Sequence, residues 1–362
     1  MVNKASMNEY QPDFVTPPGE TLLEVLESLT MTQTELAERA GRPTKTVNEI
    51  IKGKTALTPE TALQFEKVLG INASFWNNRE KQYRAFIAAQ AENEKLLENF
   101  NWLRNIPVNQ MIKFGWIPKP KEKIDQLNSL LSFFGVAGPE QWKQIWSKPL
   151  VAYRESNVYK TKLGALSAWL RCGELEAQKI RCNDFDRANF KQALVEIRQL
   201  VKEREPEIFI PKLEKMCAEC GVAVVFIPEL KGMTLSGATY WPSSRKAVIQ
   251  LSLRYKTNDQ LWFTFFHEAG HILLHKKDFI IENINGSDQV EQEANNFAKN
   301  YLIPKKLYVE FAKIKPTKSR VLEFAKKIDI DPAIVVGRLQ HEKRIPFASN
   351  LNKLKISYRW SE

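Results

Sequence analysis

Residues 257–277, TNDQLWFTFFHEAGHILLHKK, are the stretch that decides the fold of the C-terminal half. Apolar residues recur along it at helical spacing, so we predict one long helix. His267 and His271 are four residues apart, so both imidazoles project from one face, about 6 Å apart, and can meet on a single ion. Glu268 lies about 100° around the helix, beside that ion, where a general base must be to take a proton from an attacking water.

A catalytic zinc site usually has three protein ligands and one open position, so a third ligand is needed. His275 is eight residues beyond His267, about 12 Å further along a continuous helix, so we expect it to support the site without binding the metal. The following segment, residues 290–304, places Glu291 and Asn295 one helical turn apart on one face. We predict that Glu291 is the third ligand and that Asn295 hydrogen-bonds one of the metal ligands.

The pattern HExxH also occurs by chance, on amphipathic helices that carry two surface histidines. Two observations favour a metal site in this chain. Three of its four histidines lie between residues 267 and 275, and a helix with a carboxylate on the appropriate face follows. Two histidines and one glutamate suit Zn²⁺ and peptide hydrolysis.

Upstream of this helix the pattern becomes extended near residue 220. Three short runs rich in β-branched and aromatic residues are separated by turn residues: 222–227, 236–241 and 246–253. They predict a small three-stranded sheet that leads into the long helix. The third run alternates between two sets of residues, which favours a strand near a sheet edge, so we expect a substrate backbone to add along it.

The oxyanion of a peptide-hydrolysis reaction also needs a stabilising group. Tyr240, Arg254 and Tyr301 are each candidates, and the sequence does not choose among them. The Cys217–Cys220 pair is a single CxxC without a second pair of ligands, so we interpret it as packing.

Turn residues divide the N-terminal region into short helices. Residues 19–29 repeat leucines at helical spacing, and Thr32 followed by Glu35 is a capping-box pattern that begins a second helix. Gly41 and Gly53 end the second and third helices. Several short helices within about 50 residues predict a compact bundle.

The sequence of residues 30–71 resembles the XRE-type helix-turn-helix, particularly the HigA-like antidote regulators of toxin–antitoxin modules. The resemblance covers about residues 17–90 and implies a five-helix bundle whose second motif helix, Thr44 to Lys52, enters the major groove of a double-stranded DNA operator. We expect Thr44, Lys45, Thr46 and Asn48 to face the groove, and Gln33, Arg42, Lys52 and Lys54 to lie near phosphates.

Net charge does not by itself support DNA binding by this bundle. The chain carries a net charge of +11, but residues 1–90 have 10 Lys/Arg against 11 Asp/Glu, a net of -1. Residues 305–362 have 14 against 6, a net of +8, so the positive charge belongs to the C-terminal region, which is either a further docking or nucleic-acid surface or a buttress for the peptidase. A bundle that serves for homodimerisation or partner docking therefore stays open as an alternative.

The C-terminal half carries a second resemblance, to the ImmA/IrrE family of zinc metallopeptidases. The segments that carry it are SGATYW, VIQLSLR, FTFFHEAGHILLH, EQEANNFA and YLIP, which fall within residues 200–305. The resemblance implies a gluzincin-like fold in which His267, His271 and Glu291 bind Zn²⁺ and Glu268 is the catalytic acid and base. Members of the family act on intracellular proteins, notably helix-turn-helix repressors, in the control of mobile elements and stress responses.

The whole chain is predicted to be mainly α, with an α+β C-terminal part. The expected divisions are a tail (1–18), an XRE-type DNA-binding domain (19–90), a helical connector (91–200), an ImmA/IrrE-like peptidase domain (201–310) and a basic helical extension (311–362). Hydrophobic residues make up 43% and charged residues 26%, which is typical of a soluble globular protein. Four cysteines in a chain this long, with no apolar stretch that could span a membrane, favour the cytoplasm.

Together these features predict a transcriptional regulator fused to a zinc endopeptidase that cleaves an intracellular regulatory protein. The substrate would be a helix-turn-helix repressor, a toxin-like protein or the chain itself. The alternative is a non-catalytic repressor or antitoxin of a toxin–antitoxin or mobile-element module, in which the zinc fold is a sensor or binding platform.

Overall fold

The computed structural model describes residues 14–154, 163–233, 235–275, 280–281, 289–313 and 315–360. Most of the predicted tail, up to residue 13, lies outside the described residues. The chain divides into two compact units, Met1–Asn99 and Phe100–Glu362.

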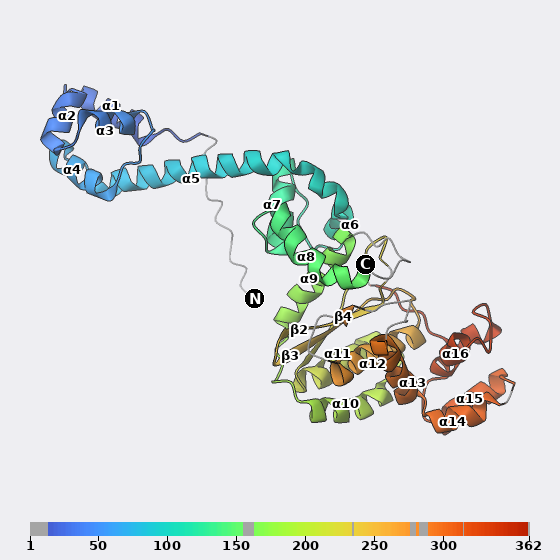
Figure 1. Ribbon diagram of the computed structural model, residues 1–362. Coiled ribbons are helices and arrows are strands. Elements are labelled where there is room, and N and C mark those ends of the chain that lie inside the picture. Colours follow the sequence, from blue (N-terminus) through green and yellow to red (C-terminus); the bar gives the residue numbers. More distant parts are fainter. Residues whose placement is uncertain are drawn as a thin grey trace. The chain divides into compact units, whose positions relative to one another are not determined.

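The first unit contains the five predicted helices, drawn in blue in Figure 1. They are α1 (Pro18–Ser28), α2 (Gln33–Ala40), α3 (Thr44–Ile51), α4 (Pro59–Leu69) and α5 (Ala73–Glu98). The Thr32 hydroxyl accepts a hydrogen bond from the backbone N–H of Glu35 at 3.2 Å, which confirms the predicted start of α2. Gly41 ends α2 in the left-handed conformation, with φ of 62°, which glycine adopts without strain.

Each helix of this unit contributes a fully buried side chain to one core. Leu22, Leu36, Val47, Phe65 and Trp76 come from α1 to α5 in turn, and each has 0% exposure. Burial of each side chain contributes about 1.5–3 kcal/mol, so the core holds the bundle together.

The second unit is built on a sheet of four strands in the order β1-β3-β2-β4. The strands are β1 (Val222–Phe226), β2 (Gly237–Ser243), β3 (Lys246–Leu251) and β4 (Ile280–Ile281). The first three confirm the prediction, and the two-residue β4 was not predicted. The predicted edge position of β3 is wrong, because β3 pairs with β1 in parallel and with β2 in antiparallel orientation. A substrate backbone therefore cannot add to β3.

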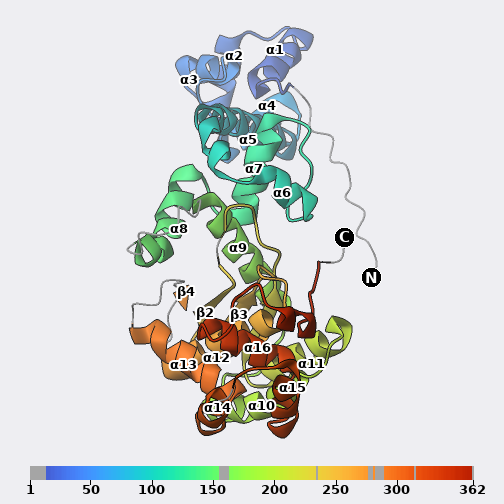
Figure 2. The same cartoon turned by 90° about the vertical axis from the view of Figure 1, so that its right-hand side faces the viewer.

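Successive side chains of β3 point to opposite faces of the sheet, and helices cover both faces. Helix α9 (Leu163–Lys179) covers one face, and α11 (Pro206–Glu219) and α12 (Asn258–Leu274) cover the other (Figure 2). The Gln250 side-chain amide donates to the carbonyl of Trp169 on α9 at 2.7 Å. Ile249, its neighbour in β3, lies in the core that contains α12.

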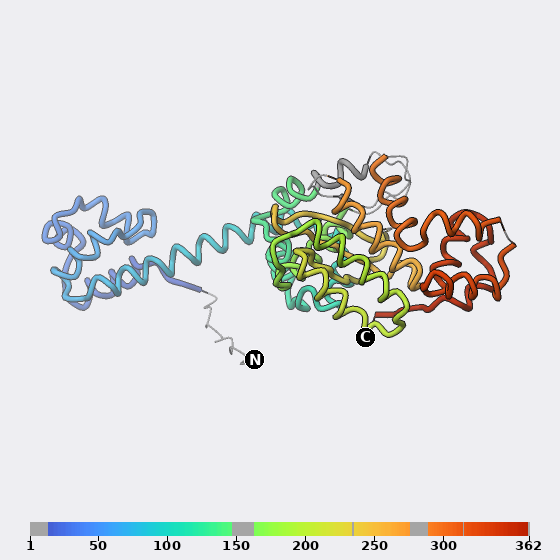
Figure 3. The backbone as a smooth tube through the Cα atoms, turned by 90° about the horizontal axis from the view of Figure 1, so that it is seen from below, coloured from blue at the N-terminus to red at the C-terminus, as the bar shows by residue number. Residues whose placement is uncertain are grey.

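The core around α12 extends to the end of the described chain. It includes Phe190, Val335 and Tyr358, so the described residues between 311 and 360 pack into the same unit as the metal-site helix and do not form a separate extension. Figure 3 shows these C-terminal residues in red, beside the orange helices. The remaining helices are η1 (Phe100–Asn105), α6 (Val108–Lys113), α7 (Lys123–Phe134), α8 (Pro139–Arg154), α10 (Arg187–Leu200), α13 (Gln289–Leu302), α14 (Lys305–Ala312), α15 (Lys318–Lys327), α16 (Pro332–His341) and η2 (Asn350–Leu354).

Among the helices that the structure describes, none combines the length and the apolar character needed to cross a membrane.

Candidate metal centre

Helix α12 carries the predicted site and is almost entirely enclosed. His267, Glu268 and His271 are exposed by only 2%, 0% and 1%. The sequence pattern indicated an apolar side and a polar side, and the structure buries both, because α13, α16 and the sheet pack around the helix. The polar groups of α12 must therefore find partners inside the protein.

Three predicted ligand atoms lie at distances that suit one tetrahedral ion. The Nε2 atoms of His267 and His271 are 2.9 Å apart. The Glu291 carboxylate lies 3.2 Å from the first of these nitrogens and 3.5 Å from the second. Ligands about 2.0–2.1 Å from a tetrahedral metal are about 3.3 Å from one another, so this donor set fits Zn²⁺.

The approach of α13 to α12 depends on a glycine. A Cβ atom on Gly270 would lie 3.3 Å from Ala294 Cα and 3.1 Å from a ring carbon of Phe297. The two helices therefore pack closely at this point. Glu291 and Ala294 are three residues apart on the same face of α13, so the close packing also brings the Glu291 carboxylate to the histidines.

Further polar side chains contact the Nδ1 atoms of the two histidines. Asn295 Oδ1 lies 3.2 Å from Nδ1 of His267, and Nδ1 of His275 lies 3.0 Å from Nδ1 of His271. Glu293 Oε2 in turn lies 3.3 Å from Nε2 of His275. These contacts orient the rings with Nε2 toward Glu291, as partners of metal-binding histidines usually do.

Glu293 is a residue that the sequence analysis did not assign to the site. It is two residues from Glu291, which places the two side chains about 200° apart around an α-helix. Its contact with His275 depends on how α12 and α13 pack, and no spacing within either helix predicts it.

Burial keeps His271 in the neutral form. Removal from water, together with the neighbouring His267 and His275, lowers its pKa from 6.5 to about 2. A neutral imidazole has the free lone pair that a metal ligand needs.

Strand β2 holds the Glu268 carboxylate in place. The Thr239 hydroxyl donates to Oε2 of Glu268 at 2.6 Å, and both residues are fully buried. A Cβ atom on Gly237 would lie 2.5 Å from Oε1 of Glu268. Any residue larger than glycine would therefore displace the carboxylate. Neither residue was predicted, although positions 237 and 239 of one strand share a face.

A cavity of about 610 Å³ opens beside His267 and Glu291. None of the three candidates for oxyanion stabilisation lines it. Tyr240 lies on the other face of β2 from Thr239, and burial raises its pKa well above the ordinary value. The Tyr301 hydroxyl donates to the carbonyl of Lys191 at 3.3 Å, and the Arg254 guanidinium lies over the ring of Tyr255.

The residues predicted at DNA lie on and around α3 of the first unit. The side chains of Thr44, Lys45, Lys52 and Lys54 are exposed, and those of Gln33, Arg42, Thr46 and Asn48 are partly exposed. Arg42 is held by a hydrogen bond of 2.6 Å from its Nε to the side-chain oxygen of Gln64. Lys45 lies 3.9 Å from the carboxylate of Glu49 one turn further along α3.

The fold and this geometry define a class: a helix-turn-helix bundle followed by a unit with an HExxH helix and a glutamate from the next helix. Comparison with protein families agrees. Residues 22–76 match a helix-turn-helix family (HTH_3), and residues 217–339 match the IrrE N-terminal-like domain (Peptidase_M78). The chain thus carries an XRE-type helix-turn-helix DNA-binding domain and a peptidase-family domain of the ImmA/IrrE type.

Solved structures similar to part of this chain include three antidote proteins. One is an addiction module antidote protein of the HigA family from Coxiella burnetii, with 32% identity over 23% of this chain and 91% of that chain, and a TM-score of 0.22. Another is Pseudomonas aeruginosa antitoxin HigA with the higBA promoter, with 26% identity, 24% and 94% coverage, and a TM-score of 0.22. The third is an antidote protein of a plasmid maintenance system from Nostoc punctiforme, with 26% identity, 23% and 92% coverage, and a TM-score of 0.23. A comparison with curated proteins found no match.

Proposed function

We propose that the chain is a DNA-binding regulator whose second unit is a zinc-dependent endopeptidase acting on a regulatory protein, such as a helix-turn-helix repressor or a toxin. The observation that carries the peptidase proposal is the cluster of His267, His271 and Glu291, whose ligand atoms all lie within 4.8 Å of one another. The buried Glu268 beside this cluster, held by Thr239, adds the acid–base group that hydrolysis requires.

In this proposal His267, His271 and Glu291 hold Zn²⁺, which when bound acts as a Lewis acid for water and for the scissile carbonyl. Glu268 accepts a proton from the attacking water and then donates it to the nitrogen of the leaving amine. Its carboxylate therefore acts first as a base and then as an acid.

The protein surroundings hold each of these groups in one orientation. The Thr239 hydrogen bond fixes the carboxylate of Glu268, so little reorganisation is needed when the proton moves. Asn295 and His275 keep the two imidazole rings turned toward Glu291.

Substitution Glu268→Gln tests the peptidase proposal, because Gln keeps the size of the side chain and cannot accept the proton. We expect the variant to bind as much zinc as the wild type and to lose cleavage by about 10²–10⁴-fold. The assays are metal analysis of purified protein and proteomics of cleaved proteins in cells that express each form. The control is Glu323→Gln, at an exposed position of α15.

The outcome also decides between this proposal and a non-catalytic role. If Glu268→Gln keeps both its zinc and its biological activity, hydrolysis is not the function. The second unit would then be a sensor or a binding platform within a repressor or antitoxin.

The DNA-binding proposal rests on the helix-turn-helix family match and on the exposed residues of α3. Lys45 and Asn48 are expected to contact an operator, so replacement of both by Ala should abolish sequence-specific binding. The assay is a gel shift on DNA fragments enriched by repeated selection with the wild-type protein. Unchanged binding would contradict the assignment and favour dimerisation or partner docking as the role of the bundle.

A further inference from the structure

The cavity beside the candidate ligands has a basic wall that the proposed reaction does not use. Apart from His267 and Glu291, five ionisable residues with acidic or basic side chains line it: Asp259, Lys299, Arg338, His341 and Lys355. Asp259 and Lys355 pair with each other at 2.6 Å, so their charges offset. We call the other three, Lys299, Arg338 and His341, the basic wall.

The guanidinium of Arg338 is held by two contacts, and one of its nitrogens has no hydrogen-bond partner among the described residues. Its Nε contacts the Glu342 carboxylate, and its guanidinium lies 4.6 Å from the centre of the Tyr308 ring. Its Nη1 is buried and has no hydrogen-bond partner among the residues that the structure describes. Because Nη1 is enclosed by protein atoms, Arg338, which lines the cavity, acts on it through the positive charge of its guanidinium.

Lys299 supplies a second cation without an acidic partner. Within the described ranges no carboxylate lies within 4.0 Å of its ammonium group, whereas Arg338 is close enough to act on it electrostatically. Burial and the charge of Arg338 lower the pKa of Lys299, and Glu342 only partly opposes them. A bound anion would stabilise both cations.

The basic wall lies within reach of a peptide bound at the metal ligands. The Phe263 ring centre is 6.3 Å from that of His267 and 6.2 Å from that of His341. The two histidine rings are therefore no further apart than the sum of these distances. Extended peptide advances about 3.3–3.6 Å per residue, so His341 of the wall lies within about four residues of a scissile bond at the metal ligands.

We propose that the basic wall binds a carboxylate of the substrate, either an Asp or Glu side chain or a free C-terminus, within about four residues of the bond that is cleaved. This inference rests on the proposed peptidase function and names the substrate class: a peptide segment with an acidic group close to the cleavage point. The carboxylate accepts a hydrogen bond from Lys299 and is attracted by the charge of Arg338.

Binding of peptide libraries to the full chain tests this inference apart from catalysis. The protein carries Glu268→Gln and is loaded with zinc, so that affinity is measured without turnover. The probes are fluorescent peptide libraries with Glu or with Gln fixed at each position in turn, each made with a free or an amidated C-terminus.

We expect a Glu library, or the free-acid form, to bind about tenfold more tightly than its neutral counterpart. Whichever pair discriminates identifies the source of the carboxylate. Lys299→Gln should reduce the discrimination to less than about twofold, Lys299→Arg should preserve it, and Lys306→Gln, an exposed lysine on α14, should not change it.

Equal affinity for charged and neutral libraries, in both terminal forms, would overturn the inference. So would discrimination that survives Lys299→Gln. If the wild-type chain cleaves none of these peptides but Lys299-dependent discrimination remains, the peptidase proposal fails while the basic wall stands as a carboxylate site. If the wild-type chain cleaves these peptides without a preference for charge, the peptidase proposal stands and the basic wall fails as a carboxylate site.

Discussion

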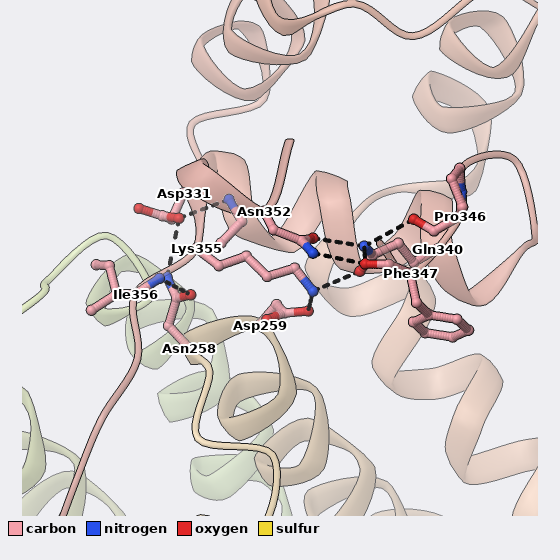
Figure 4. A network of polar contacts seen from close by, with 10 residues as sticks. Asn258, Asp259, Asp331, Gln340, Pro346, Phe347, Asn352, Lys355 and Ile356 are labelled. Carbon is pink, nitrogen blue, oxygen red and sulfur yellow. Dashed lines mark hydrogen bonds and ion pairs between the residues drawn. The ribbon is translucent and has the colours of Figure 1, made fainter. Parts of the chain in front are cut away.

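Removal of the Lys355 ammonium group should destabilise the second unit strongly. Its Nζ donates to Oδ2 of Asp259 at 2.6 Å and to Oε1 of Gln340 at 2.7 Å (Figure 4). The Asp259 side chain is only 2% exposed and that of Lys355 only 11%. Substitution Lys355→Met keeps the apolar stem and leaves the carboxylate buried without its cation.

The magnitude follows from the burial of this pair. Removal of one partner of a buried ion pair costs about 3–5 kcal/mol. Asp259 lies in the first turn of α12, where the helix dipole favours an anion by about 0.3–1 kcal/mol, so we expect a net loss of about 2–4 kcal/mol. Gly337 packs against the carboxylate, which limits its movement toward solvent. For a unit of this size the loss corresponds to a decrease in Tm of about 5–15 °C.

Differential scanning calorimetry of the full chain measures this shift. The control is Lys353→Met, at an exposed position of η2, which should leave Tm unchanged. The double variant Asp259→Asn, Lys355→Met removes both charges and should recover part of the loss. A Tm for Lys355→Met within about 1 °C of the wild type would refute the reasoning that the pair is buried and mutually dependent.

Four further predictions concern the metal centre. Gly237→Ala should displace the Glu268 carboxylate, so that metal analysis finds zinc retained while a peptide assay finds activity reduced by at least about 10²-fold. Thr239→Val should lower kcat by about 10–100-fold, Thr239→Ser should restore most of it, and normal kcat in the valine variant would contradict the positioning role. When free zinc is present at about 100 times its Kd, its removal by a chelator should lower the free energy of unfolding by about 2.7 kcal/mol and Tm by about 5–10 °C. In the Glu291→Ala variant the chelator should leave Tm unchanged. The metal-free protein should lose stability as pH falls below 6.5, by about 1.4 kcal/mol per pH unit, because His271 binds a proton in the unfolded chain and not in the folded one. Urea unfolding in the presence of a chelator at pH 7 and at pH 5.5 measures this loss. The variant His271→Asn should show a smaller dependence of stability on pH.

The sequence predicted the elements of the metal centre because helical spacing alone decides which residues share a face. His267 and His271 on α12, and Glu291 and Asn295 on α13, each pair within one helix, and the structure brings the two pairs together. Contacts that join different elements had no such signal. Thr239 reaches α12 from the sheet, and its role depends on the packing of β2 against that helix.

Local pattern also misplaced β3. Gln250 and Ser252 alternate with apolar residues, as polar residues would in a half-exposed strand. Gln250 is in fact fully buried, and its side-chain N–H donates to the Trp169 carbonyl on α9. A polar residue with a tertiary partner cannot be distinguished from an exposed one by periodicity.

Charge was a similarly poor guide to the C-terminal region. Residues 305–362 carry a net charge of +8, which left a surface for a partner and a buttress for the peptidase equally open. The apolar side chains of α16, among them Val335 and Val336, are fully buried in the core that contains α12. The basic side chains lie on the remaining surface or, like Arg338, line the cavity.

The pairing of the start of α12 with the C-terminal segment has a consequence for biosynthesis. Asn258, at the start of α12, exchanges hydrogen bonds with Ile356, 98 residues later in the chain (Figure 4). Domains nearer the N-terminus generally fold first during translation, and the first unit makes its whole core before residue 100. A ribosome therefore displays a finished helix-turn-helix bundle well before it has synthesised the residues that complete the wall around the histidines.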